Sequence, residues 1–281
     1  MKHIRKIIIL LFVALLFAGC SSGNGGKEEV VADKTIRVGV NPVPHAEILE
    51  NAVKPVLEAE GWKLEVVVYQ DYVLPNENLV AGELDANYFQ TLGYMHGQND
   101  SHGWALTAVK GVHIEPMGLY SDKYTSAGDL PDGAHISVPN DEDNRTRALE
   151  FLIANGFLNP LEGELSANTL NGNTEANPHG YVIEELEAAQ LPLALADVDA
   201  AVINGNYALG AGLPATYPAL LVESFDAETT IRRTNFIVVL EGNENSEKIQ
   251  ALVKAVTSDA VQKYIEDTYK GAVITSFVDP Q

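Results

Sequence analysis

The sequence predicts an α/β protein with two lobes, and three observations support this fold class. Residues 35–70 read as a strand, a helix and a second strand, an order that implies parallel strands joined by a right-handed crossover. A second strand and helix of this kind begin near residue 134. A polar stretch at 221–235 then leads into one more strand and two helices. We therefore expect residues 34–117 and 231–281 to form lobe 1, and residues 118–230 to form lobe 2.

The first 33 residues differ from the rest of the chain. Three basic residues precede an apolar run at 7–18, and the only cysteine, Cys20, follows directly after Ala18-Gly19. This order is typical of an export signal, and the apolar run is shorter than the roughly 20 residues of a membrane-spanning helix. Its end resembles a bacterial lipobox, so we expect residues 1–19 to be a signal peptide and Cys20 to be lipidated. The alternative is an ordinary signal peptide that leaves a free thiol. Residues 20–33 are rich in Ser, Gly and charge, which predicts a flexible tether.

The charge of the chain limits its partners. The first 20 residues hold three of the 18 basic residues and none of the 39 acidic ones, so the remainder carries a net charge of −24. Nucleic acids and anionic lipid surfaces need clustered Lys and Arg, and this balance argues against both. A zwitterionic small molecule would hardly feel such a field, so the charge leaves small ligands open.

In lobe 1, the β-branched run 35–42 predicts a strand, 45–62 has apolar residues at helical spacing, and 63–70 predicts a second strand. Ligands of such sheets bind where loops leave the carboxyl ends of the strands, which here are residues 41–45 and 70–74. Residues 104–121 read as two strands with a break at Lys110-Gly111. Glu115-Pro116 interrupts the pattern again and marks a crossing between the lobes.

Lobe 2 begins with a predicted strand that ends at Pro139. The helix predicted at 143–156 has Asp141 or Asp143 as its N-cap and Gly156 as its end. We expect a helix at 175–192 and a buried strand at 199–206 that opens into a loop. The chain then returns to lobe 1 with a strand at 236–242 and helices at 246–258 and 259–271.

The stretch from Asp71 to His96 is the strongest candidate for a binding site. It places Tyr72, Tyr88, Phe89 and Tyr94 among amides and acids, in a chain otherwise poor in aromatic residues. Aromatic walls with a few placed polar groups are typical of small-molecule pockets. The alternative is that these rings belong to the hydrophobic core.

Polar candidates lie in lobe 2. Arg147 follows the amino end of its predicted helix, where a guanidinium and free backbone N–H groups suit bidentate binding of a carboxylate. The alternative is a surface arginine paired with a neighbouring acid. Asn204 and Asn206 follow the buried strand, and their amides can serve both an ammonium group and a carboxylate. Asn-Gly at 204–205 is also a plain turn signal.

Four blocks carry a resemblance to a known family: DYVLPNENLVAGELDANYFQ, VPND at 138–141, ELEAAQLP at 185–192 and DVDAAVINGNYA at 197–208. In this order they resemble the substrate-binding lipoproteins of methionine ABC importers, the NlpA family. The resemblance implies a periplasmic-binding-protein-like fold with a ligand cleft between the lobes. It also implies a lipid-anchored protein on the extracytoplasmic face of the cell membrane, which delivers methionine, or a related amino acid or dipeptide, to a permease and ATPase complex. No cofactor and no catalytic group are expected.

The resemblance assigns roles to individual residues. Arg147 matches the family's carboxylate-binding arginine in the PND...R-A-L pattern, and Arg145 is a neighbour that is easily mistaken for it. Asn204, Asn206 and Asn235 match positions that hold the polar head of the ligand. The family's aromatic residues around the thioether match Tyr72, Phe89 and Tyr94, and sulfur packs favourably at ring edges. Thr91 departs from the family, which commonly has His at this position. The ligand could therefore be L- or D-methionine, a related amino acid or a dipeptide.

Two other classes remain as alternatives. An enzyme on a two-lobe scaffold would need a positioned base, for which His45 with Asp71 or Glu77 is the available material. A surface adhesin would fit the tether and the acidity but leaves the Arg and Asn residues unexplained. The histidines show neither HExxH nor another metal-ligand spacing, so no metal site is expected.

Overall fold

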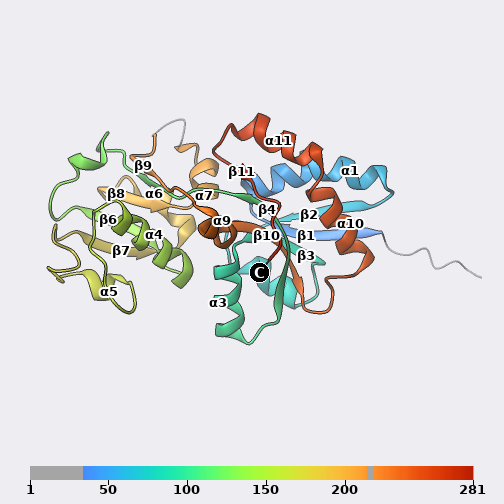
Figure 1. Cartoon of the computed structure of the whole chain (residues 1–281), viewed down its shortest axis with the longest axis horizontal. Coiled ribbons are helices and arrows are strands. Elements are labelled where there is room, and N and C mark those ends of the chain that lie inside the picture. Colours follow the sequence, from blue (N-terminus) through green and yellow to red (C-terminus); the bar gives the residue numbers. More distant parts are fainter. Residues whose placement is uncertain (1–33, 214–217, 281) are drawn as a thin grey trace, which may run out of the picture. The chain divides into compact units, whose positions relative to one another are not determined.

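A computed structural model describes residues 34–213 and 218–280, which fold into two β-sheets with helices around them (Figure 1). The predicted signal peptide, the lipidation site Cys20 and the tether lie outside the described residues. The six-stranded sheet has the order β11-β4-β10-β3-β1-β2. Its strands are β1 (Thr35–Val40), β2 (Lys63–Val68), β3 (Ala86–Gln90), β4 (Leu106–Ile114), β10 (Thr234–Leu240) and β11 (Ile274–Thr275). β1 is parallel to β2 and β3, whereas β10 is antiparallel to β3 and β4.

The five-stranded sheet has the order β7-β6-β8-β5-β9. Its strands are β5 (Gly118–Tyr120), β6 (His135–Pro139), β7 (Val182–Leu186), β8 (Ala200–Ile203) and β9 (Leu221–Val222). β6 is parallel to β7 and β8, and β5 is antiparallel to β8 and β9. The chain enters this sheet between β4 and β5 and leaves it through α9 (Ala227–Arg233), which leads into β10. This two-sheet α/β architecture confirms the predicted fold class, including the return of the last part of the chain to the first sheet.

Helices connect and cover the strands (Figure 1). Around the first sheet they are the π-helical turns η1 (Pro42–Ala46) and η2 (Leu49–Val53), then α1 (Lys54–Ala59), α2 (Leu74–Val80), α3 (Leu92–His102), α10 (Glu247–Val256) and α11 (Asp259–Tyr269). Around the second they are η3 (Ala127–Asp129), α4 (Glu142–Ala154), α5 (Ala167–Leu170), η4 (Ala188–Gln190), α6 (Leu191–Ala194) and α7 (Gly205–Gly210). In residues 34–213 and 218–280, none of these helices combines the length and the apolar composition that a membrane span needs.

The sequence explains why α4 begins and ends where it does. The Asp141 side chain accepts a hydrogen bond from the backbone N–H of Asn144 at 3.0 Å, so Asp141 rather than Asp143 is the N-cap. Just beyond the last turn, Gly156 has φ of 78°, a conformation that disfavours other residues. The inner face of α4 buries Ala148, Leu149 and Leu152.

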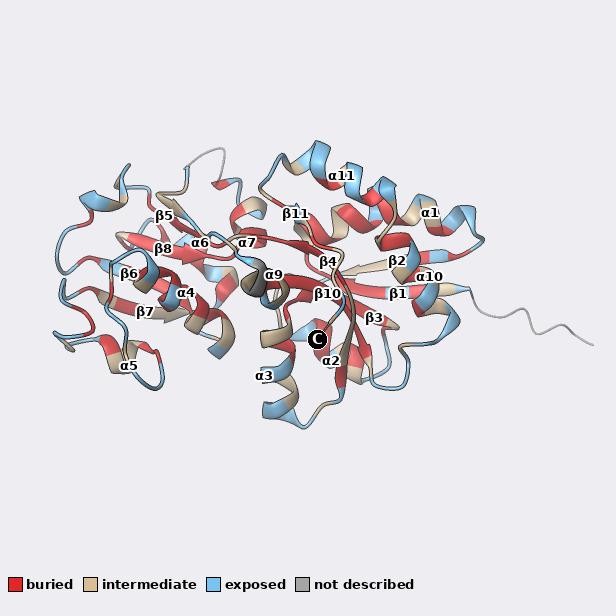
Figure 2. Ribbon diagram, in the orientation of Figure 1, coloured by how far each residue is buried: buried red, intermediate tan, exposed pale blue. Residues whose placement is uncertain are grey.

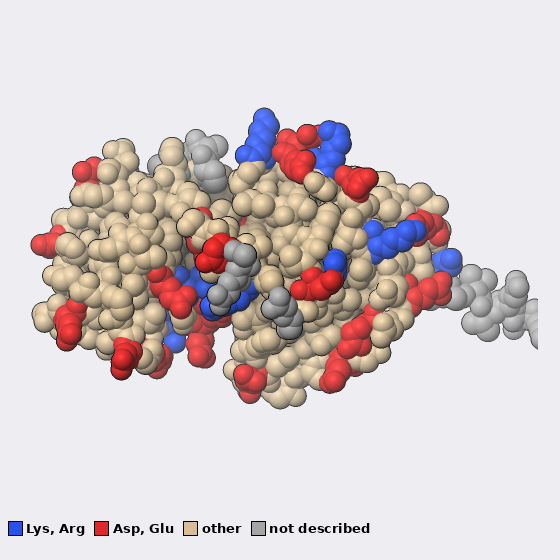
Figure 3. Space-filling model, in the orientation of Figure 1, with Lys and Arg blue, Asp and Glu red and all other residues tan. Residues whose placement is uncertain are grey.

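Each sheet has its own hydrophobic core (Figure 2). In the first, the β-branched residues of β1 pack against the apolar faces of α10 and α11, which bury residues such as Leu252 and Ile265. In the second, Ile136 and Val138 of β6 pack against α4. Burying a side chain of this size contributes about 1.5–3 kcal/mol. The acidic side chains lie outside these cores, and Figure 3 shows them scattered over the visible face of the molecule.

The predicted elements differ from the structure at three places. The strand expected at 199–206 is shorter, because β8 ends at Ile203, and helix α7 rather than a loop begins at Gly205. The segment 175–192 is not a helix, because Val182–Leu186 forms β7 and pairs with β6 in parallel, with Ile183 beside Ile136. Pairing at this sheet edge overrides the helix propensity of a Glu- and Leu-rich segment. The strand is also not broken at Lys110-Gly111, since β4 runs through to Ile114, although its pairing with β10 shifts register on both sides of this dipeptide. A Cβ on Gly111 would lie 2.8 Å from the backbone oxygen of Ser276, so this glycine permits close packing of the neighbouring strand.

Candidate functional site

A pocket with about 370 Å³ of empty space, part of it open to solvent, is lined by strands of the first sheet and by helices and loops that adjoin both sheets. The lining includes all eight residues predicted to bind ligand: Tyr72, Phe89, Thr91, Tyr94, Arg147, Asn204, Asn206 and Asn235. It also includes Gln90, Glu115, Asn144 and Gly205, which the sequence analysis does not single out.

The loops that leave β1 and β2 meet at this end of the first sheet. The Asn41 amide donates hydrogen bonds to the backbone oxygens of Tyr69 and Asp71 at 2.9 and 3.1 Å. These two bonds tie the loops together, as expected for the carboxyl ends of neighbouring parallel strands. The second loop thereby carries Tyr72 to the pocket.

Three aromatic rings form one wall of the pocket. The ring centre of Tyr72 lies 5.7 Å from that of Phe89 and 5.8 Å from that of Tyr94. The hydroxyl of Tyr94 donates to the backbone oxygen of Tyr72 at 2.9 Å, which holds the loop against α3. Tyr88 does not take part, because successive residues of a strand point to opposite faces, and its ring lies in the core of the first sheet.

The opposite side of the pocket is polar and comes from α4 and the start of α7. The Asn204 amide donates to the side-chain oxygen of Asn144 at 2.7 Å, and the Tyr72 hydroxyl donates to that of Asn206 at 2.6 Å. The second bond joins a loop of the first sheet to a helix of the second. The side-chain oxygen of Asn204 is buried and has no hydrogen-bond partner within the described residues. A buried acceptor of this kind favours a donor supplied by a ligand.

Arg147 is buried, and most of its guanidinium is already paired. Its Nε and Nη2 atoms donate to the Glu223 carboxylate, with Nε–Oε1 at 3.0 Å and Nη2–Oε2 at 2.5 Å, and Nη2 also donates to the backbone oxygen of Glu115. Within the described residues only Nη1 has no hydrogen-bond partner, so the structure differs from the bidentate geometry expected from the sequence. The alternative of an exposed surface arginine is also wrong, because the Arg147 side chain is buried. Arg145 lies outside the pocket, where it pairs with Glu164 and Glu185.

Thr91 is both a pocket residue and the N-cap of α3. Its hydroxyl accepts from the backbone N–H of Tyr94 and donates to the Asp143 carboxylate of α4 at 3.2 Å. The two helices approach closely here, since a Cβ on Gly93 would lie 2.1 Å from Asp143 Oδ1. The Thr91 position therefore adjoins a contact between helices of different sheets.

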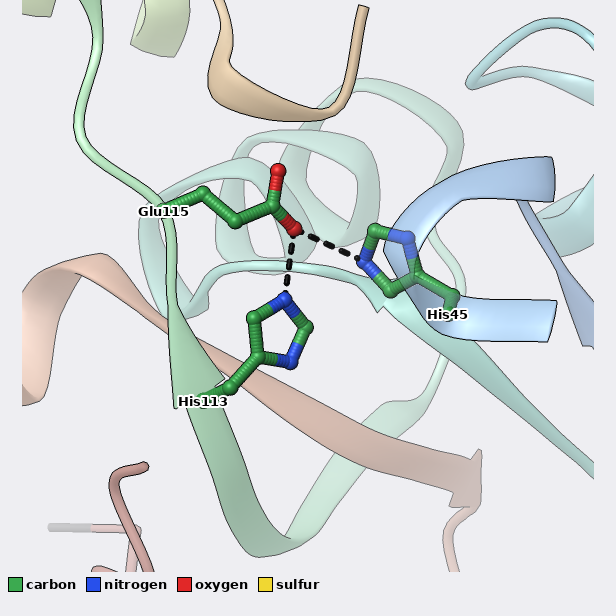
Figure 4. A group of neighbouring side chains, drawn as sticks. All are labelled: His45, His113 and Glu115. Atoms are coloured by element: carbon green, nitrogen blue, oxygen red, sulfur yellow. Dashed lines mark hydrogen bonds and ion pairs between the residues drawn. The ribbon is translucent and has the colours of Figure 1, made fainter. Parts of the chain in front are cut away.

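Figure 4 shows a buried cluster of His45, His113 and Glu115. The cluster adjoins the pocket, because Glu115 lines the pocket and His45 contacts Asn235. His45 Nε2 and His113 Nε2 lie 3.3 and 2.5 Å from the same oxygen of Glu115. His45 Nε2 also lies 3.0 Å from the side-chain oxygen of Asn235. Burial raises the pKa of the Glu115 carboxyl and lowers the pKa of both imidazoles, because each charged form is poorly solvated there.

Spacing along the sequence gave no sign of this cluster of potential metal ligands. His45 comes from η1, while His113 and Glu115 come from the end of β4, so only the folded chain brings the three together. They are three side chains of metal-binding type that the described part of the chain places within reach of one ion. His45 is not paired with Asp71, whose carboxylate instead accepts from the backbone N–H groups of Val73 and Leu74. The His45–Asp71 pair that an enzyme could have used as a positioned base is therefore not formed.

Two α/β sheets joined by crossing segments, with one pocket lined from both, define a periplasmic-binding-protein-like fold of the substrate-binding class. The family model of the NlpA lipoproteins matches residues 36–277. The chain belongs to the NlpA lipoprotein family.

Individual relatives cover nearly the whole chain. It is 34% identical over 280 residues to the methionine-binding lipoprotein MetQ of Bacillus subtilis, which covers 98% of both chains. A nutrient-binding protein of Burkholderia cenocepacia, solved with bound methionine, is 36% identical, with a TM-score of 0.76 over 86% of this chain and all of that one. The periplasmic substrate-binding protein of an ABC transporter from Coxiella burnetii is 34% identical, with the same TM-score and coverage.

Proposed function

We propose that this chain binds methionine, or a closely related amino acid or dipeptide, outside the cytoplasm and delivers it to an ABC importer. The observation that carries this proposal is the pocket itself, which gathers an aromatic wall, a buried arginine and four asparagines. The methionine-binding names of the B. subtilis and B. cenocepacia relatives and the transporter name of the C. burnetii relative support the same conclusion.

The polar side of the pocket suits the zwitterionic head of an amino acid. Arg147 Nη1 supplies a charged donor for the carboxylate. The partnerless oxygen of Asn204 and the carboxylate of Glu115 supply acceptors for the ammonium group. Because Glu223 holds the rest of the guanidinium, the arginine is fixed in place before the ligand arrives, which lowers the entropy lost on binding.

The aromatic wall suits an apolar or thioether side chain. Tyr72, Phe89 and Tyr94 present ring edges and faces within one patch, and sulfur packs favourably about 5 Å from a ring. Phe89 has no polar atom, and the Tyr94 hydroxyl is engaged by the Tyr72 backbone. This side of the pocket therefore disfavours a charged ligand side chain.

Contacts between the two sheets explain how a ligand would be retained. The hydrogen bonds Tyr72–Asn206 and Thr91–Asp143 each join a segment of the first sheet to a helix of the second. A ligand touched from both sides binds best when these contacts are made, so it shifts the population toward the closed arrangement. Release to a transporter then requires these contacts to open.

We assign the membrane attachment to a lipid on Cys20, in keeping with the lipoprotein names of the relatives. Replacing Cys20 by Ser should move the protein from the membrane fraction to the soluble fraction, while leaving ligand binding unchanged. Immunoblotting of both fractions tests this. Continued anchoring of the variant would require a different attachment.

The proposed ligand is tested by thermal unfolding against a panel of amino acids, both methionine enantiomers and methionyl dipeptides. The protein is first unfolded and refolded to remove bound ligand. A ligand at 100 times its Kd adds about 2.7 kcal/mol to the free energy of unfolding, which raises the Tm. A rise in Tm with methionine supports the proposal. A rise with a different compound of the panel would keep the receptor function but assign it another ligand, and no rise with any compound would contradict the proposal.

A further inference from the structure

The three side chains of the His45–His113–Glu115 cluster aim at a common point. In Figure 4 both imidazoles direct Nε2 toward the same carboxylate oxygen. The three ligating atoms lie within 4.8 Å of one another, and all three residues are buried. Two imidazoles and one carboxylate form a donor set that suits Zn²⁺ and related divalent transition metals.

The spacing of these atoms is close to that of a metal site. In tetrahedral Zn²⁺ sites the bonds to His nitrogen and carboxylate oxygen are about 2.0–2.2 Å, which places neighbouring ligand atoms roughly 3.4 Å apart. The 3.3 Å between His45 Nε2 and Glu115 Oε1 matches this spacing. The shorter His113–Glu115 contact has to widen by less than about 1 Å. Rotation of the Glu115 carboxylate, whose stem has several free torsions, provides that movement.

Groups around the cluster would hold the ligands in place. Ligating histidines commonly use their second ring nitrogen in a hydrogen bond that fixes the ring. His113 makes such a bond through Nδ1 to the hydroxyl of Tyr88, which is itself fully buried. The ring of Tyr88 also packs edge-on against His45, with centres 4.9 Å apart. Tyr88 thus contacts both imidazoles, and it orients His113 through the hydrogen bond.

The cluster also has a candidate for a fourth ligand. The Asn235 side-chain oxygen lies 3.0 Å from His45 Nε2, close to the spacing expected for neighbouring ligands. Asn235 and Glu115 both line the amino-acid pocket, so an ion at this place would lie at the wall of that pocket.

We propose that His45, His113 and Glu115 form a binding site for one divalent transition metal ion of the Zn²⁺ class, directly beside the amino-acid pocket. The site does not depend on which amino acid the pocket takes. Its second role would be to link the rim loop after β1 to the end of β4, from which the chain crosses to the second sheet. Metal binding and amino-acid binding then share Glu115 and Asn235.

The test uses the full chain without a histidine tag, stripped with a chelator and then titrated with Zn²⁺ alone. We expect one Zn²⁺ per chain by equilibrium dialysis and metal analysis, and a rise in Tm with added Zn²⁺. His113→Gln removes a direct ligand, so its Zn²⁺ affinity should fall by more than the roughly 10–100-fold typical of second-shell losses. Tyr88→Phe, which keeps the ring and removes only the hydroxyl, should lose about 10–100-fold.

A matched control is available on the surface. His135 lies 3.5 Å from Glu184, and both side chains are about half exposed, so His135→Gln removes a histidine with an acidic neighbour outside the cluster. This variant should bind Zn²⁺ like the parent chain. Glu115→Gln keeps the shape and hydrogen bonding of the cluster, and it serves as the deciding variant if His113→Gln does not fold by circular dichroism.

Two results would overturn the proposal. One is the absence of stoichiometric Zn²⁺ binding, which would make the cluster a hydrogen-bonded chain from Tyr88 through Glu115 to Asn235 and nothing more. The other is Zn²⁺ binding that His113→Gln and Glu115→Gln leave unchanged but His135→Gln abolishes, because the ion would then lie on the surface. Neither result bears on methionine binding, which the thermal panel tests separately.

Discussion

Replacing Arg147 by Ala tests the proposed site most directly, because this side chain has both a structural and a binding role. Its side chain is 4% exposed and that of its partner Glu223 is 12% exposed. The substitution therefore removes a donor to the ligand carboxylate. It also leaves Glu223 partly buried, with Arg233 at 4.0 Å as its remaining cationic neighbour. The two effects have to be measured apart.

The expected losses follow from these contacts. A hydrogen bond to a charged group is worth about 1.5–3 kcal/mol, so the ligand Kd should rise roughly 10- to 150-fold. Removing one partner of a buried ion pair costs about 3–5 kcal/mol of stability. We expect the lower end of this range, because Glu223 retains some access to water.

The assay is isothermal titration calorimetry with the ligand identified by the thermal panel, at a temperature at which circular dichroism shows every variant to be folded. The double variant Arg147→Met, Glu223→Gln removes both charges and should recover most of the stability without recovering affinity. Arg145→Ala is the control, since Arg145 pairs with Glu164 and Glu185 outside the pocket. It should keep the parent Kd, because every contact it loses lies outside the pocket.

Three outcomes would refute this reasoning. An unchanged Kd for Arg147→Ala would remove Arg147 from the binding site. A double variant that regains both stability and affinity would show that Arg147 acts only by neutralising Glu223. Equal losses of affinity in the Arg145 and Arg147 variants would mean that net charge, rather than a specific contact, governs binding.

Three further predictions concern the surroundings of the pocket. Tyr72→Phe removes the 2.6 Å hydrogen bond to Asn206 that joins a loop of the first sheet to a helix of the second. Such a bond is worth about 0.5–1.5 kcal/mol, so the ligand Kd measured by calorimetry should rise roughly 2- to 13-fold. An unchanged Kd would show that this bond does not contribute to closure around the ligand. Thr91→His should reorder the ligand panel and, by removing the cap of α3, lower the free energy of unfolding by about 0.5–2 kcal/mol; an unaltered panel would show that the position does not select the ligand. Burial raises the pKa of Asp141 to about 6, above its unfolded value, so its stabilising contribution is complete at low pH and is lost as pH rises through about 6. Asp141→Asn cannot titrate and still caps α4, so in urea unfolding it should match the parent near pH 4 and exceed its stability at pH 8 by up to about 3 kcal/mol; a difference that does not grow with pH would argue against this shift.

Local sequence patterns predicted most elements correctly where β-branched runs or the helical spacing of apolar residues are clear. The β-branched strands β1, β2 and β10 and the amphipathic helices α10 and α11 lie where the sequence places them. The prediction failed at β7, where propensity favours a helix but an open edge of β6 supplies hydrogen bonds to a strand. An unpaired sheet edge is a property of the fold and cannot be read from residues 182–186 alone.

The candidate site likewise has features that the sequence predicted and features that only the fold revealed. Residue types and the family resemblance pointed to Tyr72, Phe89, Arg147 and the asparagines, all of which line the pocket. For Arg147 and Asn235 the resemblance was decisive. Only the tertiary structure revealed that Glu223 holds Arg147, since these residues lie on separate segments. The pairing leaves one nitrogen of the fork for a ligand, where the sequence suggested two.

By itself, the sequence determined the two-lobe α/β class, the return of the chain to its first sheet and eight of the residues that line the pocket. Each of these depends on local periodicity, on turn residues or on short motifs. The tertiary structure decided which side chains meet, and the cluster of His45, His113 and Glu115 is the clearest case. His45 reaches the end of β4 only because β1 and β4 are strands of one sheet, with β3 and β10 between them. Contacts of this kind depend on strand order and register, which no local pattern encodes.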